Sequence, residues 1–342
     1  MKLKKIITYS IYFLLNNEKK RRVFKETFKT KLISSKSFIF FANQINKDLR
    51  SSTKFFIKKT SSENTSGKID IFYVGSDALE DFELNLKYQN KKFILITGDS
   101  DRTISKKLDI YKRISNNDNL LFWYSQNCIS PNKKIRQIPI GLDYISQFHN
   151  SHSFGLNIHD HNLLPLKYEK KILNIIKNSP KFNSRESLIF CNYQFTFNNK
   201  DRVDCFNSVN KKYCYFLKKR IPHLDNFKKQ SKFKFVLAPF GDGIDTHRVW
   251  EALLLGNIPI VKSSPLDKLY KDFPVLIVRS WKDLTYKRLM FAEKKFNNST
   301  YFYEKLLTNY WKVKILKKKL SINKLANYEM FKTYLLNDKL ST

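Results

Sequence analysis

Short apolar runs that end in small or polar turn residues recur along the chain, with helical stretches between them. The first four runs lie at 69–74, 92–97, 120–124 and 135–140. Runs of this kind are typical of buried strands, and strands that alternate with helices form a mostly parallel sheet. The sequence therefore predicts a first α/β domain in this region.

A second series of apolar runs begins after a polar, His-bearing stretch at 144–166. Its runs lie at 187–191, 233–238, 258–261 and 275–278, and a Lys-rich helical tail follows from Thr285. The 342 residues are too many for one typical core and suit two domains. We therefore predict an α/β fold with two Rossmann-like domains facing a central cleft, over 1–166 and 167–342.

The most informative segment is 235–261, which reads FVLAPFGDGIDTHRVWEALLLGNIPIV. A predicted strand leads into a turn where Gly241 and Gly243 let the backbone approach a ligand. The next helix begins near Asp245 or Thr246, either of which can cap it. A helix N-terminus at the carboxyl end of a parallel strand offers unpaired N–H groups to a phosphate, so the segment predicts an anion site.

Two charged side chains on this helix, Arg248 and Glu251, have two interpretations. The planar fork of Arg248 suits a diphosphate, and the carboxylate of Glu251 suits the two hydroxyls of a ribose. Alternatively, the two residues are spaced to pair with each other on a solvated helix face. The combination with the glycine turn, the cap and the strand that follows favours ligand binding.

The segment 235–261, with its continuation at 274–278, resembles the exostosin-type glycosyltransferases, whose C-terminal domain carries a similar Arg-x-x-Glu-Ala-x-x-x-Gly-x-x-Pro run. The match is specific over 231–284, whereas 123–127 and 138–143 resemble acceptor-domain segments loosely. The resemblance implies a GT-B glycosyltransferase that is inverting and independent of metal, with a nucleotide-diphosphate sugar as co-substrate and no cofactor. It also implies that the first domain binds a glycan or lipid-linked acceptor and the second domain the donor.

In that comparison Arg248 matches the basic residue near the diphosphate, and Glu251 matches the acid that holds the ribose. The donor site that we predict consists of Arg202, Gly241, Gly243, Thr246, His247, Arg248 and Glu251. The chain has Asn257 where the animal exostosins commonly have Cys, and it shows neither a stem nor a clear membrane anchor. The α-fucosyltransferases share a related helix-then-strand run, so the sugar and the acceptor stay open.

An inverting enzyme also needs a general base, which we expect from the first domain across the cleft. Asp77, Asp99 and Asp143 each follow a predicted strand. Each also suits the more common role of capping a helix. We place Asp143 first because the neighbouring Gly141 predicts a tight turn at the sheet edge.

Two further patterns compete with this interpretation. Asp99 and Asp101 form a DxD pattern, which holds a divalent cation in other glycosyltransferases. Such a pattern is more often a simple polar turn. We also expect this pattern in the wrong half of the chain for the donor site. Four histidines come close together in the sequence without a cysteine or a paired carboxylate: His149, His152, His159 and His161. We therefore predict a polar interdomain loop and no metal site.

The charge of the chain is strongly positive, with 64 Lys and Arg against 30 Asp and Glu, or +34 at pH 7. Such a field attracts phosphates, nucleic acids and anionic membranes. The excess is mostly Lys spread among Asn, Ile and Phe, a mixture that AT-rich coding also produces. A basic nucleic-acid-binding protein is the alternative function, with 211–234 as its best segment, but it leaves the segment 235–261 unexplained.

The apolar-rich run at 6–15 lies between basic residues and is shorter than the ~20 residues that span a bilayer. We expect either a docked first helix or peripheral contact with an anionic membrane. The four cysteines show no metal or disulfide spacing, and we expect buried free thiols. The expected location is cytoplasmic, with peripheral membrane contact as an option, or the Golgi lumen in a eukaryotic source.

Overall fold

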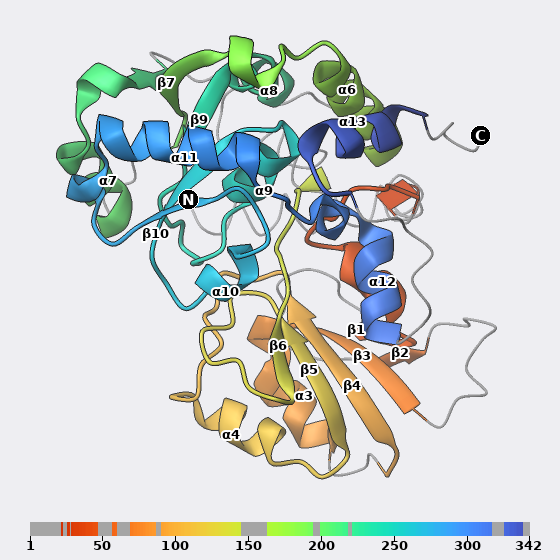
Figure 1. The fold of residues 1–342 in the computed structure, drawn as a ribbon. Helices are drawn as coiled ribbons and strands as arrows, with labels where there is room; N and C mark the ends of the chain where they lie inside the picture. The colour runs from red at the N-terminus through yellow and green to blue at the C-terminus, as the bar shows by residue number, and fades with distance from the viewer. Residues whose placement is uncertain are drawn as a thin grey trace, which may run out of the picture.

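The computed structural model describes residues 22, 26–27, 29–46, 57–59, 69–86, 90–144, 163–193, 199–217, 221–316 and 325–337. Within these residues the chain forms two β-sheets that carry helices, so the predicted α/β class is confirmed (Figure 1). The apolar run at 6–15 and the four clustered histidines (His149, His152, His159 and His161) lie outside the described residues.

The first sheet has six strands in the order β2-β1-β3-β4-β5-β6. Its strands are β1 (Gln44–Asn46), β2 (Ile57–Lys59), β3 (Ile69–Gly75), β4 (Lys92–Gly98), β5 (Leu120–Ser125) and β6 (Ile135–Gln137). The β1–β2 pair is antiparallel and the other neighbouring pairs are parallel. The four runs predicted in this half all form strands, whereas β1 and β2 were not predicted.

Helices cover both faces of the first sheet. One face packs against α3 (Leu79–Leu86) and α4 (Asp109–Ser115), and the apolar core there includes Phe72, Phe82 and Ile114. The other face packs against η1 (Ser37–Phe41) and α12 (Thr308–Leu316). A helix from the end of the chain therefore completes the core of the first sheet. Figure 1 shows α12 above β1 and β3.

The second sheet has five strands, all parallel, in the order β11-β10-β9-β7-β8. Its strands are β7 (Glu186–Cys191), β8 (Cys214–Phe216), β9 (Phe233–Leu237), β10 (Ile258–Lys262) and β11 (Leu276–Val278). The four predicted runs again form strands. The strand β8 was not predicted; it follows the helix that ends at Ser208.

Helices also cover both faces of the second sheet. The helices on one face are α6 (Pro165–Lys177), α8 (His223–Gln230), α9 (His247–Leu254) and α13 (Tyr328–Asn337), and those on the other are α7 (Lys200–Ser208) and α11 (Tyr286–Asn298). A short α10 (Asp267–Tyr270) and the 3-10 turns η2 (Ser76–Ala78), η3 (Phe182–Ser184), η4 (Lys211–Tyr213), η5 (Trp281–Asp283) and η6 (Tyr303–Leu306) complete the described elements. The core beneath α9 also receives Leu32, Ile140 and Leu142 from the first half of the chain. The two halves therefore share buried apolar surface.

A buried carboxylate adds a polar connection between the halves. Glu169 of α6 accepts hydrogen bonds from the backbone N–H groups of Lys31 and Leu32, at 2.9 and 3.2 Å, and from the hydroxyl of Tyr144. Burial raises the pKa of this carboxyl, although these donors oppose the shift. The predicted division at residue 166 stays a prediction.

Two smaller expectations concern the thiols and the membrane. Cys128, Cys191 and Cys205 are buried free thiols, as predicted, and Cys214 is half-buried. In the part of the chain that the structure describes, no helix combines the length and apolar character that crossing a bilayer requires.

Candidate functional site

The glycine turn between β9 and α9 contacts the first half of the chain. A Cβ atom on Gly243 would lie 2.9 Å from Nδ2 of Asn127 and 3.2 Å from a carboxylate oxygen of Asp101. Both of these residues follow strands of the first sheet. A Cβ atom on Gly241 would lie 3.3 Å from the guanidinium of Arg202. A side chain at Gly243 would therefore displace Asn127, whereas one at Gly241 would meet the Arg202 side chain less closely.

The N-terminus of α7 holds the backbone of this turn in place. The Asp201 carboxylate accepts a hydrogen bond from the N–H of Phe240 at 3.0 Å, and the Asn199 amide donates to the carbonyl of Gly241 at 2.7 Å. Nε of Arg202 donates to the carbonyl of Phe240 at 3.2 Å. These three bonds fix the turn and bring the Arg202 guanidinium beside it.

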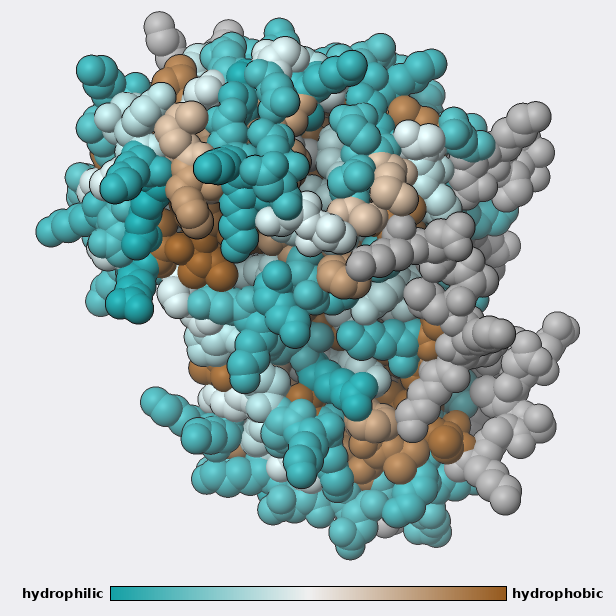
Figure 2. Space-filling model, in the orientation of Figure 1, coloured by the Kyte–Doolittle hydropathy of each residue, from teal (hydrophilic) through white to brown (hydrophobic). Residues whose placement is uncertain are grey.

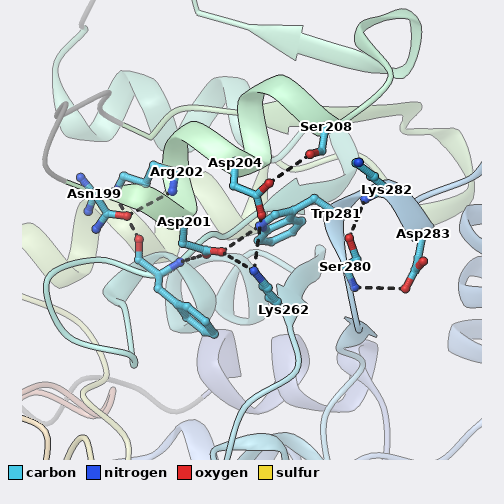
Figure 3. A network of polar contacts seen from close by, with 11 residues as sticks. Asn199, Asp201, Arg202, Asp204, Ser208, Lys262, Ser280, Trp281, Lys282 and Asp283 are labelled. Carbon is cyan, nitrogen blue, oxygen red and sulfur yellow. Dashed lines mark hydrogen bonds and ion pairs between the residues drawn. The ribbon is translucent and has the colours of Figure 1, made fainter.

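Asp201 is itself anchored by side chains from η5 and the end of β10, as Figure 3 shows. Its carboxylate accepts hydrogen bonds from Nε1 of Trp281 at 3.0 Å and from Nζ of Lys262 at 3.3 Å. Lys262 also pairs with Asp204, one turn further along α7. The position of the glycine turn therefore depends on three elements: α7, β10 and η5.

The helix α9 begins at His247, with Thr246 at its N-cap position as predicted. The expectation that Thr246 or Asp245 caps the helix through its side chain is wrong, because the structure shows no such bond. Oγ1 of Thr246 is buried and has no hydrogen-bond partner among the described residues. The N-terminus of α9 thus keeps backbone donors that a ligand can use.

Asp245 instead joins the two halves of the chain. It is 2% exposed, and its carboxylate accepts hydrogen bonds from the N–H of Ile140, from Nε1 of Trp250 and from the hydroxyl of Tyr270, at 2.8, 2.9 and 3.0 Å. Burial raises its pKa to about 6, although these donors oppose the shift. Its own backbone N–H donates to Oδ1 of Asn127 at 2.9 Å.

His247, the first residue of α9, also reaches the first half. Its Nδ1 lies 2.6 Å from the carbonyl oxygen of Gly141, which adopts φ +65° just after β6. The predicted donor residues Gly243 and His247 are therefore both at the junction of the two halves. The predicted base Asp143 lies two residues beyond Gly141 in the chain.

Arg248 and Glu251 do not pair with each other; the described residues contain no ion pair between them. Nε of Arg248 donates to Oδ1 of Asn192 at 3.0 Å, and its guanidinium lies 5.9 Å from the ring centre of Tyr193. Glu251 is only 7% exposed, and its Oε1 lies 3.1 Å from Nε2 of His223. The alternative of an ion pair on a solvated face is therefore wrong.

Burial is the main influence on the charged groups of this site, and the charge of Arg202 adds to it at Arg248. Burial, with the nearby charge of Arg202, lowers the pKa of Arg248 to about 10, although Glu251 opposes the shift. Burial also works against ionisation of Glu251, but His223, His247 and Arg248 outweigh it and hold its pKa below the ordinary value. A bound anion would relieve the repulsion between the two arginines.

The DxD pattern also lies at this junction, contrary to expectation. Asp101 faces the backbone N–H of Gly243, whereas Asp99 pairs with Lys36 and Asp77 accepts a hydrogen bond from Ser100. Burial and then the neighbouring Asp242 raise the pKa of Asp101, against the effect of His247. Across the described stretches, no three His, Cys, Asp or Glu side chains are grouped so that they could hold a metal ion.

Several residues of the site had no signal in the sequence. Asn127, Asn192, Asn199 and His223 position the glycine turn, Arg248 and Glu251. The predicted residues Arg202, Gly241, Gly243, Thr246, His247, Arg248 and Glu251 all lie on the turn, on α9 or beside them. Comparisons with models of known protein families and with curated proteins find no match.

Proposed function

We propose that the protein is a glycosyltransferase of the GT-B type, which transfers a sugar from a nucleotide-diphosphate sugar to a glycan or lipid-linked acceptor. In this proposal the two sheets belong to two Rossmann-like domains, and the donor binds at the glycine turn of the second. The reaction is inverting and needs no metal ion, because protein groups neutralise the diphosphate.

The observation that carries the proposal is the meeting of two arginines with a glycine turn and a helix N-terminus. Arg202 is hydrogen-bonded to the carbonyl of Phe240 in the turn, and Arg248 lies in the first turn of α9. The buried hydroxyl of Thr246 is unpartnered among the described residues. Two fixed positive charges beside free backbone donors suit the two phosphates of a nucleotide sugar and the diphosphate that leaves.

The ribose is assigned to Glu251, one turn further along the helix. Nε2 of His223 contacts one carboxylate oxygen, and its Nδ1 contacts the hydroxyl of Tyr168, whose ring lies nearly parallel to the imidazole. This support orients the carboxylate while leaving its second oxygen to accept a hydroxyl. The depressed pKa keeps Glu251 ionised at neutral pH, as this role requires.

The acceptor side of the junction contains two carboxylates that can serve as the base. Asp143 remains the candidate from the sequence. Asp101 is a second candidate, because its raised pKa improves it as a base near neutral pH and it faces the donor turn. Asp99 and Asp77 are less suited, since Lys36 and Ser100 engage their carboxylates.

The proposal is tested by measuring thermal unfolding with UDP, GDP or a single-stranded oligonucleotide. We expect one of the nucleoside diphosphates to stabilise the protein, by about 2.7 kcal/mol at a concentration near 100 times its Kd. Arg202→Ala should lose this stabilisation, whereas the exposed control Arg279→Ala should keep it. Stabilisation by the oligonucleotide alone would contradict the proposal and favour the nucleic-acid alternative.

A further inference from the structure

The outward side of α11 exposes large apolar side chains on two successive turns. Phe291 is 67% exposed, Tyr286 is 54% exposed and Met290 is 41% exposed. Tyr286 and Met290 are four residues apart and adjacent on the helix surface, and Phe291 lies further round the same outward side. Exposed apolar residues are common singly, but three on one 13-residue helix form a patch.

The same side of α11 is basic. Lys287, Arg288, Lys294 and Lys295 are exposed, and in the described part of the chain none of them pairs with an acid. The acidic residue of this helix, Glu293, is half-buried and pairs with Lys234 at 2.6 Å. We call the side formed by Tyr286, Lys287, Arg288, Met290, Phe291, Lys294 and Lys295 the α11 face. Its charge is +4.

The neighbouring turn η4 extends this surface. The ring of Tyr213 lies 5.8 Å from that of Tyr286, and the exposed Lys211 and Lys212 come from the same turn. Nζ of Lys211 lies 3.8 Å above the ring of Phe206. Figure 2 shows hydrophobic side chains among hydrophilic ones where α11 crosses the front of the molecule.

The opposite side of α11 fixes the helix to the fold. Leu289 and Ala292 are buried in the core of the second sheet, together with Trp281. The ring of Phe296 packs on that of Phe182, with 4.0 Å between their centres. This buried side anchors the helix, and the exposed apolar residues of the α11 face do not belong to the core.

We propose that the α11 face docks the protein on the headgroup region of an anionic lipid bilayer. Aromatic rings and Met partition into the interfacial layer, while the surrounding cations bind anionic headgroups. A helix with exposed apolar side chains among Lys and Arg suits both the interfacial layer and the anionic headgroups. The proposal does not depend on the glycosyltransferase assignment.

Two other occupants fit the surface less well. A symmetric second copy would bring the same cations against each other, which opposes pairing. A nucleic acid would neutralise the cations but has no counterpart for the aliphatic side chain of Met290. A lipid bilayer has anionic headgroups for the cations and acyl chains for the apolar side chains of the α11 face.

The first test is sedimentation of the full chain with phosphatidylcholine vesicles, with and without about one-third phosphatidylserine. The Lys294→Glu/Lys295→Glu variant should bind the anionic vesicles at least about tenfold more weakly, because the charges that attract the headgroups are reversed. The Met290→Ser/Phe291→Ser variant should also bind about tenfold more weakly, because apolar surface no longer enters the interface. Lys106→Glu/Lys107→Glu and Leu84→Ser, exposed positions on the first half, are the matched controls and should bind like the parent.

The second test places a fluorophore on the α11 face. The four native tryptophans (Trp123, Trp250, Trp281 and Trp311) are buried, so Phe291→Trp adds an exposed reporter. Its emission should shift to shorter wavelength with anionic vesicles, and that of Leu84→Trp should not. Circular dichroism checks that each variant is folded.

Several results would overturn the proposal. Unchanged vesicle binding in both α11 variants would mean that another segment, such as 6–15, makes the contact. Binding could also be lost on charge reversal while Met290→Ser/Phe291→Ser has no effect and Phe291→Trp shows no shift. This result would mean that the protein adsorbs by charge alone and does not dock through the α11 face. Binding of an oligonucleotide in place of vesicles, lost in the same charge variant, would assign the face to nucleic acid.

Discussion

The substitution Asp245→Asn removes a buried carboxylate that joins the two halves of the protein. Asparagine keeps one acceptor oxygen for Trp250 and Tyr270, which both donate to Oδ1 of Asp245. Its NH₂ group, however, then faces the N–H of Ile140, which Oδ2 accepts at 2.8 Å in the native protein. A buried donor without an acceptor costs about 1–3 kcal/mol.

The pH dependence of this cost has a definite sign. The pKa of Asp245 is raised to about 6 in the folded state, from 3.8 in the unfolded chain, so the folded state binds the proton more tightly. The stability that this group contributes is therefore complete below about pH 4 and is lost as the pH rises through 6. Two pKa units correspond to roughly 3 kcal/mol. Asp245→Asn should thus destabilise the protein more near pH 4 than at pH 7.5.

The assay is urea unfolding of both proteins at intervals from pH 4 to pH 7.5. The difference between their free energies of unfolding should shrink by about 2–3 kcal/mol across this range. Asp118→Asn, an exposed position in the loop before β5, is the control and should show a small difference at every pH. A difference for Asp245→Asn that stays constant or grows with pH would refute the reasoning.

Two further predictions concern the glycine turn and the metal. Gly243→Ala should cost about 1–3 kcal/mol of unfolding free energy, because its Cβ would displace an Asn127 side chain that is already bonded to Asp245. Gly241→Ala should cost less in the same urea assay, because its nearest contact is the flexible end of Arg202, at 3.3 Å. Transfer activity should stay near its untreated rate in excess EDTA, whereas complete loss restored by Mn²⁺ would instead implicate Asp99 and Asp101.

The sheets were predictable because each buried strand is a continuous apolar run in the sequence. All eight predicted apolar runs form strands, since a parallel strand covered on both faces must be apolar along its length. The missed strands β1, β2 and β8 have three residues each, and Gln44–Asn46 has a polar residue at each end. Such short pairings depend on the neighbouring strand rather than on their own sequence.

The part of the site within one segment was predictable from the sequence, whereas its contacts with distant segments were not. The glycine turn and Arg248 share a strand-turn-helix unit, so their proximity follows from sequence spacing. His223, 28 residues from Glu251, and Asn127, 118 residues from Asp245, meet their partners only through tertiary packing. The same packing brings Asp101 to Gly243, which is why the DxD pattern was expected in the wrong place.

The central claim is that Arg248 and Glu251 bind the nucleoside diphosphate. The most direct test is calorimetric titration of the nucleoside diphosphate that stabilises the parent protein into Arg248→Ala and Glu251→Gln. Charge-assisted hydrogen bonds contribute about 1.5–3 kcal/mol each, so Glu251→Gln should bind roughly 10- to 100-fold more weakly and Arg248→Ala more weakly still. The exposed controls Glu186→Gln and Arg279→Ala should bind like the parent. Unchanged affinity in both site variants would contradict the donor-site assignment.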